Sequence, residues 1–132
     1  MRMRYLITGI TIMMLSACAP SPPNDLEPGV SWDLAERRAQ TISDVRYDLS
    51  LTIPADRNEP IEGLETVTFY LSDTAGGVVL DFRQPAEYVQ GIRIDEAEID
   101  FDMKEQHILI PESVIKVGAN RLTITFRAGD MS

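Results

Sequence analysis

The chain has 132 residues, enough for one domain, and 44% of them are hydrophobic and 25% charged, as in an ordinary folded protein. This composition excludes a disordered chain, a collagen and a long coiled coil. The 21 acidic residues outnumber the 12 basic ones, and the net charge is −9. A surface of this sign repels phosphate groups, so we expect no nucleic-acid partner.

The first 17 residues are typical of an export signal. Arg2 and Arg4 form a short basic start, and residues 5–15 form a mostly apolar run. This run is too short for a membrane-spanning helix, which needs about 20 residues, but it fits the core of a signal peptide. We therefore predict that residues 1–17 are removed. The remaining chain then has 10 basic and 21 acidic residues, a net charge of −11.

The only cysteine, Cys18, directly follows Leu15-Ser16-Ala17. Small residues before a single cysteine at the end of such a core resemble the processing site of bacterial lipoproteins, where the cysteine is lipidated. Because two or three acyl chains anchor stably where one is marginal, we expect Cys18 to attach the chain to a membrane. In lipoproteins, an Ala at the position of Ala19 favours the outer membrane, here facing the periplasm. The competing interpretation is a plain signal peptide with an incidental cysteine, which would leave a lone thiol without a disulfide partner.

Residues 18–30 are rich in proline, with four prolines between Ala19 and Gly29. Such a segment is extended and semi-rigid, so we predict a tether that holds the following domain away from the membrane.

Residues 31–41 carry the pattern of one short helix. Ser31 or Asp33 can cap its start, and with Asp33 as the cap, Glu36 stands three residues later, as in a capping box. We expect Trp32, the only tryptophan, to pack the helix onto the rest of the domain. The same pattern places Leu34, Ala35 and Ile42 toward a neighbouring element, and Glu36, Arg37 and Arg38 in water.

From residue 43 onward, apolar residues recur at every second position, which indicates half-buried β-strands. No long helical pattern separates them, so parallel βαβ units are not expected. Residues 31–132 are therefore predicted to form an all-β, antiparallel β-sandwich preceded by the one short helix. We expect about seven short strands, at 45–53, 66–71, 78–82, 89–94, 98–103, 107–110 and 122–126, with a polar loop at 54–63, a hairpin turn at Gly76-Gly77 and a turn at 117–120.

The first of these strands shows the alternation most clearly, and its apolar side chains are expected to face the core: Val45, Tyr47, Leu49, Leu51 and Ile53. Burial of roughly twenty inward side chains contributes about 1.5–3 kcal/mol each, and ordering the backbone costs about 1–2 kcal/mol per residue. The two summed free energies are comparable. We therefore expect modest stability.

Four groups of segments follow one another in a specific order. They are residues 42–50 with Tyr47-Asp48-Leu49, residues 61–71 with Ile61-Glu62-Gly63, Leu80-Asp81-Phe82, and residues 107–130 with Gly118-Ala119-Asn120 before Ile124-Thr125-Phe126. Together they resemble the amino-terminal domain of the aminopeptidase N family of zinc metallo-aminopeptidases, most of all its bacterial lipoprotein members. The resemblance covers about residues 29–132. It implies a β-sandwich that opens with the Tyr-x-Leu strand and has the Leu-Asp-Phe strand at its centre.

Two functional motifs of the aminopeptidase N family are missing from this sequence. The family binds zinc through His-Glu-x-x-His on a helix, and this chain has a single histidine, His107. The substrate-binding Gly-Ala-Met-Glu-Asn segment is also missing. We therefore assign no catalytic residue, no metal ligand and no cofactor to this chain. Because the family continues beyond the point where this sequence ends, at Met131-Ser132, the sandwich is expected to be incomplete and its partner to be a peptidase catalytic domain.

The remaining candidate residues have simpler interpretations. A lone histidine such as His107 at the start of a strand is expected at a turn or an edge. Glu98, Asp100 and Asp102 alternate with Ile99, Phe101 and Met103, which favours a solvated strand face over a calcium site. No Gly-x-Ser-x-Gly sequence and no phosphate-binding glycine loop is present.

Two hypotheses of function remain. In the first, the chain is the non-catalytic amino-terminal sandwich of an aminopeptidase N-like lipoprotein. In the second, it is a stand-alone lipid-anchored β-sandwich of the cell envelope that binds a partner, for example by adding a peptide strand to an exposed sheet edge. An independent small hydrolase has almost no support. An open sheet edge would also make the isolated chain prone to self-association.

Overall fold

The computed structural model describes residues 26–128. One helix, α1 (Trp32–Thr41), precedes eight strands. The strands are β1 (Ile42–Thr52), β2 (Ile61–Leu71), β3 (Val78–Asp81), β4 (Val89–Ile94), β5 (Ala97–Glu98), β6 (Asp102–Lys104), β7 (His107–Ile110) and β8 (Gly118–Ala128), with two single-turn 3-10 helices, η1 (Ala86–Tyr88) and η2 (Glu112–Val114).

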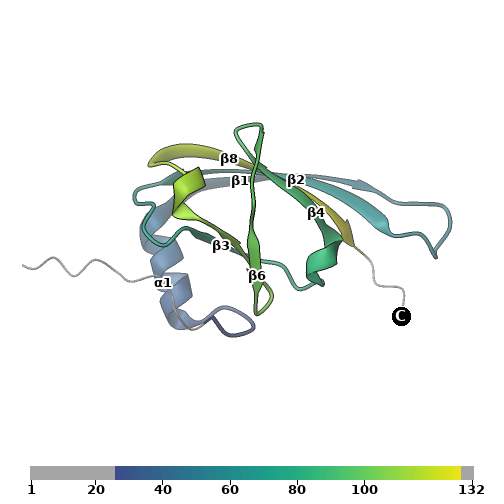
Figure 1. The fold of residues 1–132 in the computed structure, drawn as a ribbon, viewed down its shortest axis with the longest axis horizontal. Coiled ribbons are helices and arrows are strands. Elements are labelled where there is room, and N and C mark those ends of the chain that lie inside the picture. Colours follow the sequence, from purple (N-terminus) through teal and green to yellow (C-terminus); the bar gives the residue numbers. More distant parts are fainter. Residues whose placement is uncertain (1–25, 129–132) are drawn as a thin grey trace, which may run out of the picture.

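The strands form two antiparallel sheets. One has five strands in the order β1-β2-β8-β4-β5, and the other has three in the order β3-β7-β6. Figure 1 shows the smaller sheet below the larger one, and the β1–β2 hairpin reaching past it at the right. The prediction of an all-β, antiparallel, sandwich-like fold with one short helix is confirmed.

The core lies between the two sheets. In the five-stranded sheet, β2 and β8 pair along their whole length, with Val67 opposite Leu122. In the smaller sheet, Ile108 and Ile110 of the central strand β7 face them. Because successive residues in a strand point to opposite faces, only alternate positions reach this core. The buried residues of the cluster are Val67, Phe69, Leu71, Val78, Val89, Ile92, Ile94, Ile108, Ile110, Ile115, Leu122 and Ile124.

Helix α1 begins at Ser31, whose hydroxyl accepts a hydrogen bond from the Leu34 N–H at 3.2 Å, so Ser31 and not Asp33 is the cap. Leu34 is the buried residue of the helix. The expectation that Trp32 packs the helix onto the domain is wrong, because its side chain is 80% exposed. Trp32 is the first residue of the helix and points into solvent, and Leu34 makes the packing contact instead.

Several boundaries differ from the sequence-based expectations. β2 begins at Ile61 and β8 at Gly118, so the loop after β1 is shorter than expected and residues 118–120 belong to a strand, not a turn. The buried Asn120 explains the second difference. Its amide oxygen accepts from the Lys116 N–H at 3.1 Å, and its amide nitrogen donates to the carbonyls of Lys116 and Gly118. A strand side chain thus closes the turn that precedes it.

The turn at Gly76-Gly77 is present, but it is not a hairpin turn. It joins β2 to β3, which lie in different sheets. Gly77 has a φ of +72°, and a Cβ there would overlap the carbonyl oxygen of Ile110. The position therefore requires glycine for two independent reasons.

The strand expected at 98–103 is divided between the sheets. β5 pairs with β4, the chain then crosses, and β6 pairs with β7. The turns of both hairpins consist of two residues with positive φ, Asp95-Glu96 and Glu105-Gln106. The sequence does not predict these turns, because neither pair contains the glycine or asparagine that is usual there. Glu98, Asp100 and Asp102 are exposed, as expected of a solvated face, while Ile99, Phe101 and Met103 are half-buried against the core.

Candidate interaction surface

β1 carries an apolar face that the described part of the chain covers only in part. It pairs with β2, with Tyr47 opposite Val67 and Leu49 opposite Glu65, so its odd-numbered side chains lie on the same face as the core residues of β2. Yet Tyr47 is 67% exposed and Leu49 52% exposed. We call the exposed apolar residues of this face, together with Ile53 directly after the strand, the β1 stripe: Val45, Tyr47, Leu49, Leu51 and Ile53.

The exposure of the β1 stripe corrects the expectation that these side chains face the core. The strand itself was predicted from its alternation, and it is present. However, the smaller sheet has three strands against five, and β3 is its edge strand, contrary to the expectation that the strand with Leu80-Asp81-Phe82 lies at the centre of the sandwich. The exposure of the β1 side chains shows that this second layer does not cover them fully. Alternation therefore identifies which side chains share a face, while coverage by a second layer decides whether that face is buried.

The free edge of β3 is protected by two arginines of α1. Arg38 donates from Nη2 to the Val79 carbonyl at 2.8 Å, and Arg37 donates to the carbonyls of Ala75 and Gly77. Arg38 also forms a two-pronged bond with the Asp81 carboxylate, at 2.8 and 3.1 Å. The expectation that these arginines stay in water is wrong, because both are half-buried and occupy the outward carbonyls of the sheet edge.

A groove runs between the stripe-bearing side of the larger sheet and β3. It consists of two neighbouring cavities of about 330 and 280 Å³, and Tyr47, Val67, Leu80 and Asp81 line both. The second cavity also includes Phe82 and Phe126, whose rings meet edge to face at 5.9 Å, and Glu65. A mostly apolar groove with few polar groups is the usual form of a binding surface.

The two carboxylates in the groove have opposite electrostatic environments. The hydrogen bond from Arg38 lowers the pKa of Asp81, against an opposing effect of partial burial. Burial raises the pKa of Glu65, whose carboxylate forms no hydrogen bond or ion pair within residues 26–128. Glu65 stands on the inner, apolar face of β2, between Leu49 and Ile124 in the register of the sheet.

His107 is neither a turn nor an edge residue, contrary to expectation. It lies on the central strand of the smaller sheet and is 1% exposed, on the face opposite to the core residue Ile108. Its Nε2 lies 2.8 Å from the Gly29 carbonyl and 3.3 Å from Oδ1 of Asp81, while Nδ1 has no partner within the described residues. His107 therefore holds the segment before α1 against the outer face of the smaller sheet.

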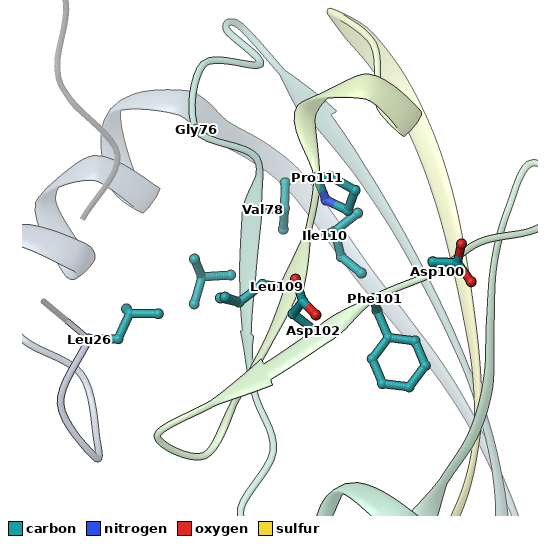
Figure 2. A pocket seen from close by; sticks show the side chains of 10 residues that line it. Leu26, Gly76, Val78, Asp100, Phe101, Asp102, Leu109, Ile110 and Pro111 are labelled. Atoms are coloured by element: carbon teal, nitrogen blue, oxygen red, sulfur yellow. The ribbon is translucent and has the colours of Figure 1, made fainter. Parts of the chain in front are cut away.

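The same outer face carries a second hollow. This cavity of about 300 Å³ is lined by Leu26, Val79 and Leu109, with Asp102 at its rim. Figure 2 shows Leu26 projecting from the segment before α1 toward Leu109, and Phe101 and Ile110 on the other side. The side chains that line the hollow are mostly apolar and include no pair of nucleophile and base. We therefore interpret it as the place where the segment before α1 packs on the sheet, and not as an active site.

The described residues do not fit a catalytic zinc ion. Within residues 26–128, no three His, Cys, Asp or Glu side chains gather in a way that could hold a metal. The only histidine of the sequence is committed to the Gly29 carbonyl and Asp81, so no pair of histidines one helical turn apart exists here.

The predicted signal peptide at 1–17, the lipidation site Cys18 and residues 18–25 of the predicted tether lie outside the described residues. Within residues 26–128, no helix is both long and apolar enough to span a bilayer. No family model matches the chain, and no curated protein matches its sequence. The resemblance to aminopeptidase N, the lipid anchor and the envelope location therefore stay predictions from the motifs.

Proposed function

We propose that this chain is the non-catalytic amino-terminal β-sandwich of an aminopeptidase N-like zinc metallopeptidase. In this proposal, the β1 stripe docks on the remainder of that enzyme. The parent reaction is the removal of amino-terminal residues from peptides, performed in a catalytic domain outside these 132 residues. Cys18 carries the lipid that anchors the enzyme to the outer membrane, facing the periplasm, and residues 18–30 form the tether, whose end, from Leu26 on, packs on the smaller sheet.

The β1 stripe is the observation that carries the proposal. Its five apolar side chains are 43–73% exposed and lie on the side of the sheet that carries the core residues of β2, and such an exposed patch marks a protein interface. Partial burial of Glu65 beside the stripe adds a carboxylate that a docking surface would either neutralise or pair.

The first test is the intact mass of the native lipoprotein, captured from membranes with an antibody to residues 26–128. We expect a mass several times the 14.8 kDa of this chain, together with aminopeptidase activity that a zinc chelator abolishes. A mass equal to this chain without residues 1–17 plus its lipid, and no such activity, would overturn the assignment.

The role of the β1 stripe is tested by Leu49→Asp in the native protein, with Ser50→Asp as the matched control. Leu49 belongs to the stripe, whereas Ser50 points to the opposite face of the same strand. Because an uncompensated carboxylate is costly to bury, Leu49→Asp should abolish most of the aminopeptidase activity, and Ser50→Asp should retain it. Equal activity of the two variants would show that the stripe is not an interface.

The second candidate function is a stand-alone lipid-anchored binding protein of the envelope, and the unpaired edge of β1 favours it. The intact mass separates the two proposals, because a stand-alone lipoprotein has only the mass of this chain and its lipid.

A further inference from the structure

β1 is an edge strand that lacks the protection found at β3. It is eleven residues long, contains no proline and pairs with β2 on one side only. No backbone hydrogen bond within residues 26–128 reaches its other side. An exposed edge of this length is a template for another strand. The question is which strand fits it.

The sequence of β1 is complementary to itself when a second copy runs antiparallel to it. If Tyr47 stands opposite Tyr47 of the second copy, Arg46 stands opposite Asp48, and Val45 opposite Leu49. Directly opposite residues share a face, so opposite charges meet on the polar face and apolar side chains meet on the stripe face. A register centred on Asp48 would instead oppose two aspartates.

The surroundings of Tyr47 support the same centre. Tyr47 is the middle residue of Ile42–Thr52, so the register uses the strand symmetrically. The bulge at Asp44, which has a φ of +53°, interrupts the pairing with β2 between Ser43 and Arg46. The regular ladder about Tyr47 is therefore limited to residues 46–48 of each copy. Two Arg46–Asp48 pairs then flank the two-fold axis.

We propose that β1 pairs antiparallel with β1 of a second copy of this chain, about a two-fold axis at Tyr47, and joins the two five-stranded sheets into one. The pairing is isologous, so both copies use the same surface and the assembly closes as a dimer. It occupies the edge of β1, whereas the docking proposed above occupies the face of the strand. The two proposals can therefore fail independently.

The test is a charge exchange in the full chain, purified in detergent and measured by sedimentation equilibrium. Arg46→Asp alone places two aspartates opposite each other, and Asp48→Arg alone places two arginines opposite each other. Each should weaken the dimer about tenfold, because every dimer contains two such pairs. The double variant R46D/D48R restores opposite charges and should return the dissociation constant to within about threefold of the original.

A second measurement fixes the register. In membranes under oxidising conditions, Tyr47→Cys should give a disulfide-linked dimer, because the two positions face each other across the axis. Ser50→Cys should not, since the two copies of residue 50 would be about 20 Å apart along the ladder. The unchanged chain controls for any disulfide formed by Cys18.

Three outcomes would overturn the proposal: a monomer at every concentration, a dimer that the single charge changes leave unaltered, or a double variant as weak as the single ones. The last two would mean that another surface or register forms the dimer. A monomer that binds an added apolar peptide would mean that the edge of β1 serves a foreign strand.

Discussion

The edge strands β1 and β3 lie on the same side of the sandwich, and they differ in how far other groups of the chain bind their free edge. At β3, Arg38 donates to the Val79 carbonyl and forms an ion pair with Asp81, and Arg37 donates to the Gly77 carbonyl just before the strand. At β1, the free edge of the eleven-residue strand has no partner strand within the described part of the chain, and the β1 stripe is covered only in part. Sheet edges invite association unless they are blocked, and this contrast is why we place the proposed contact at β1 and not at β3.

The same contrast appears in the two groove carboxylates. Asp81, on the protected side, has an arginine partner and a lowered pKa. Glu65, on the side of β1, has no partner within residues 26–128 and a raised pKa. One carboxylate therefore stabilises the fold in its charged form, and the other destabilises it.

The largest expected effect compares two leucines on the same face of the larger sheet. Leu122 is fully buried, so Leu122→Ala should lower the free energy of unfolding by about 2–5 kcal/mol, through lost transfer energy and a cavity. Leu49→Ala, at a half-exposed position, should lower it by less than about 1 kcal/mol. Urea unfolding measures both. A similar loss at the two positions would mean that the β1 stripe is covered in solution.

The next effect concerns the protection of β3. Arg38→Ala removes the bonds to Val79 and Asp81 and should lower the free energy of unfolding by about 1.5–3 kcal/mol. Arg38→Lys keeps the charge but cannot reproduce the forked geometry, so it should recover only part of the loss. Thermal unfolding of the three proteins tests this order. If Arg38→Lys were as stable as the original chain, the forked bond would contribute nothing.

A smaller effect is the opposite dependence of stability on pH that the two carboxylates, Asp81 and Glu65, produce. The pKa of Asp81 is lowered from 3.8, so its stabilising contribution is present above pH 3.8 and is lost as the pH falls through the folded-state value. The pKa of Glu65 is raised from 4.5, so its destabilising contribution is absent at low pH and grows as the pH rises through the folded-state value. The two groups therefore give the stability opposite slopes.

The variants Glu65→Gln and Asp81→Asn isolate these slopes. At pH 7, Glu65→Gln should raise the melting temperature and Asp81→Asn should lower it, and at pH 3 both differences should shrink. Melting curves at the two pH values provide the measurement. The environments assigned above would be incorrect if both variants changed the melting temperature in the same direction at pH 7.

The smallest effect on stability is expected for Leu51→Lys in the β1 stripe. Leu51 is half exposed, so the change should alter the free energy of unfolding by no more than about 0.5 kcal/mol. Because the lysine replaces an exposed apolar side chain of the β1 stripe with a charged one, the concentration at which the purified chain aggregates should rise. Light scattering against concentration measures it, with Thr52→Lys as a control on the opposite face of the strand.

Much of this architecture follows from the sequence alone. The two-residue alternation identifies the long strands β1, β2 and β8, because a pleated strand sends successive side chains to opposite faces whatever surrounds it. The strands β3 and β7 are predicted from short, mostly apolar runs instead. Ser31 or Asp33 ahead of the helical pattern predicts the helix start to within two residues, and the structure selects Ser31, whose hydroxyl satisfies a free N–H. The motifs also carry the predictions of a lipidated Cys18 and of a likeness to aminopeptidase N.

Only the tertiary structure decides which apolar faces are buried and which polar groups meet. Val67 and Tyr47 belong to the same alternating pattern and stand opposite each other, yet one is in the core and the other is mostly in solvent, because the second sheet does not cover Tyr47 fully. In the same way, His107 approaches Gly29, and Arg38 approaches Asp81, across separations of 78 and 43 residues. No local pattern contains such contacts, since they depend on how the layers stack.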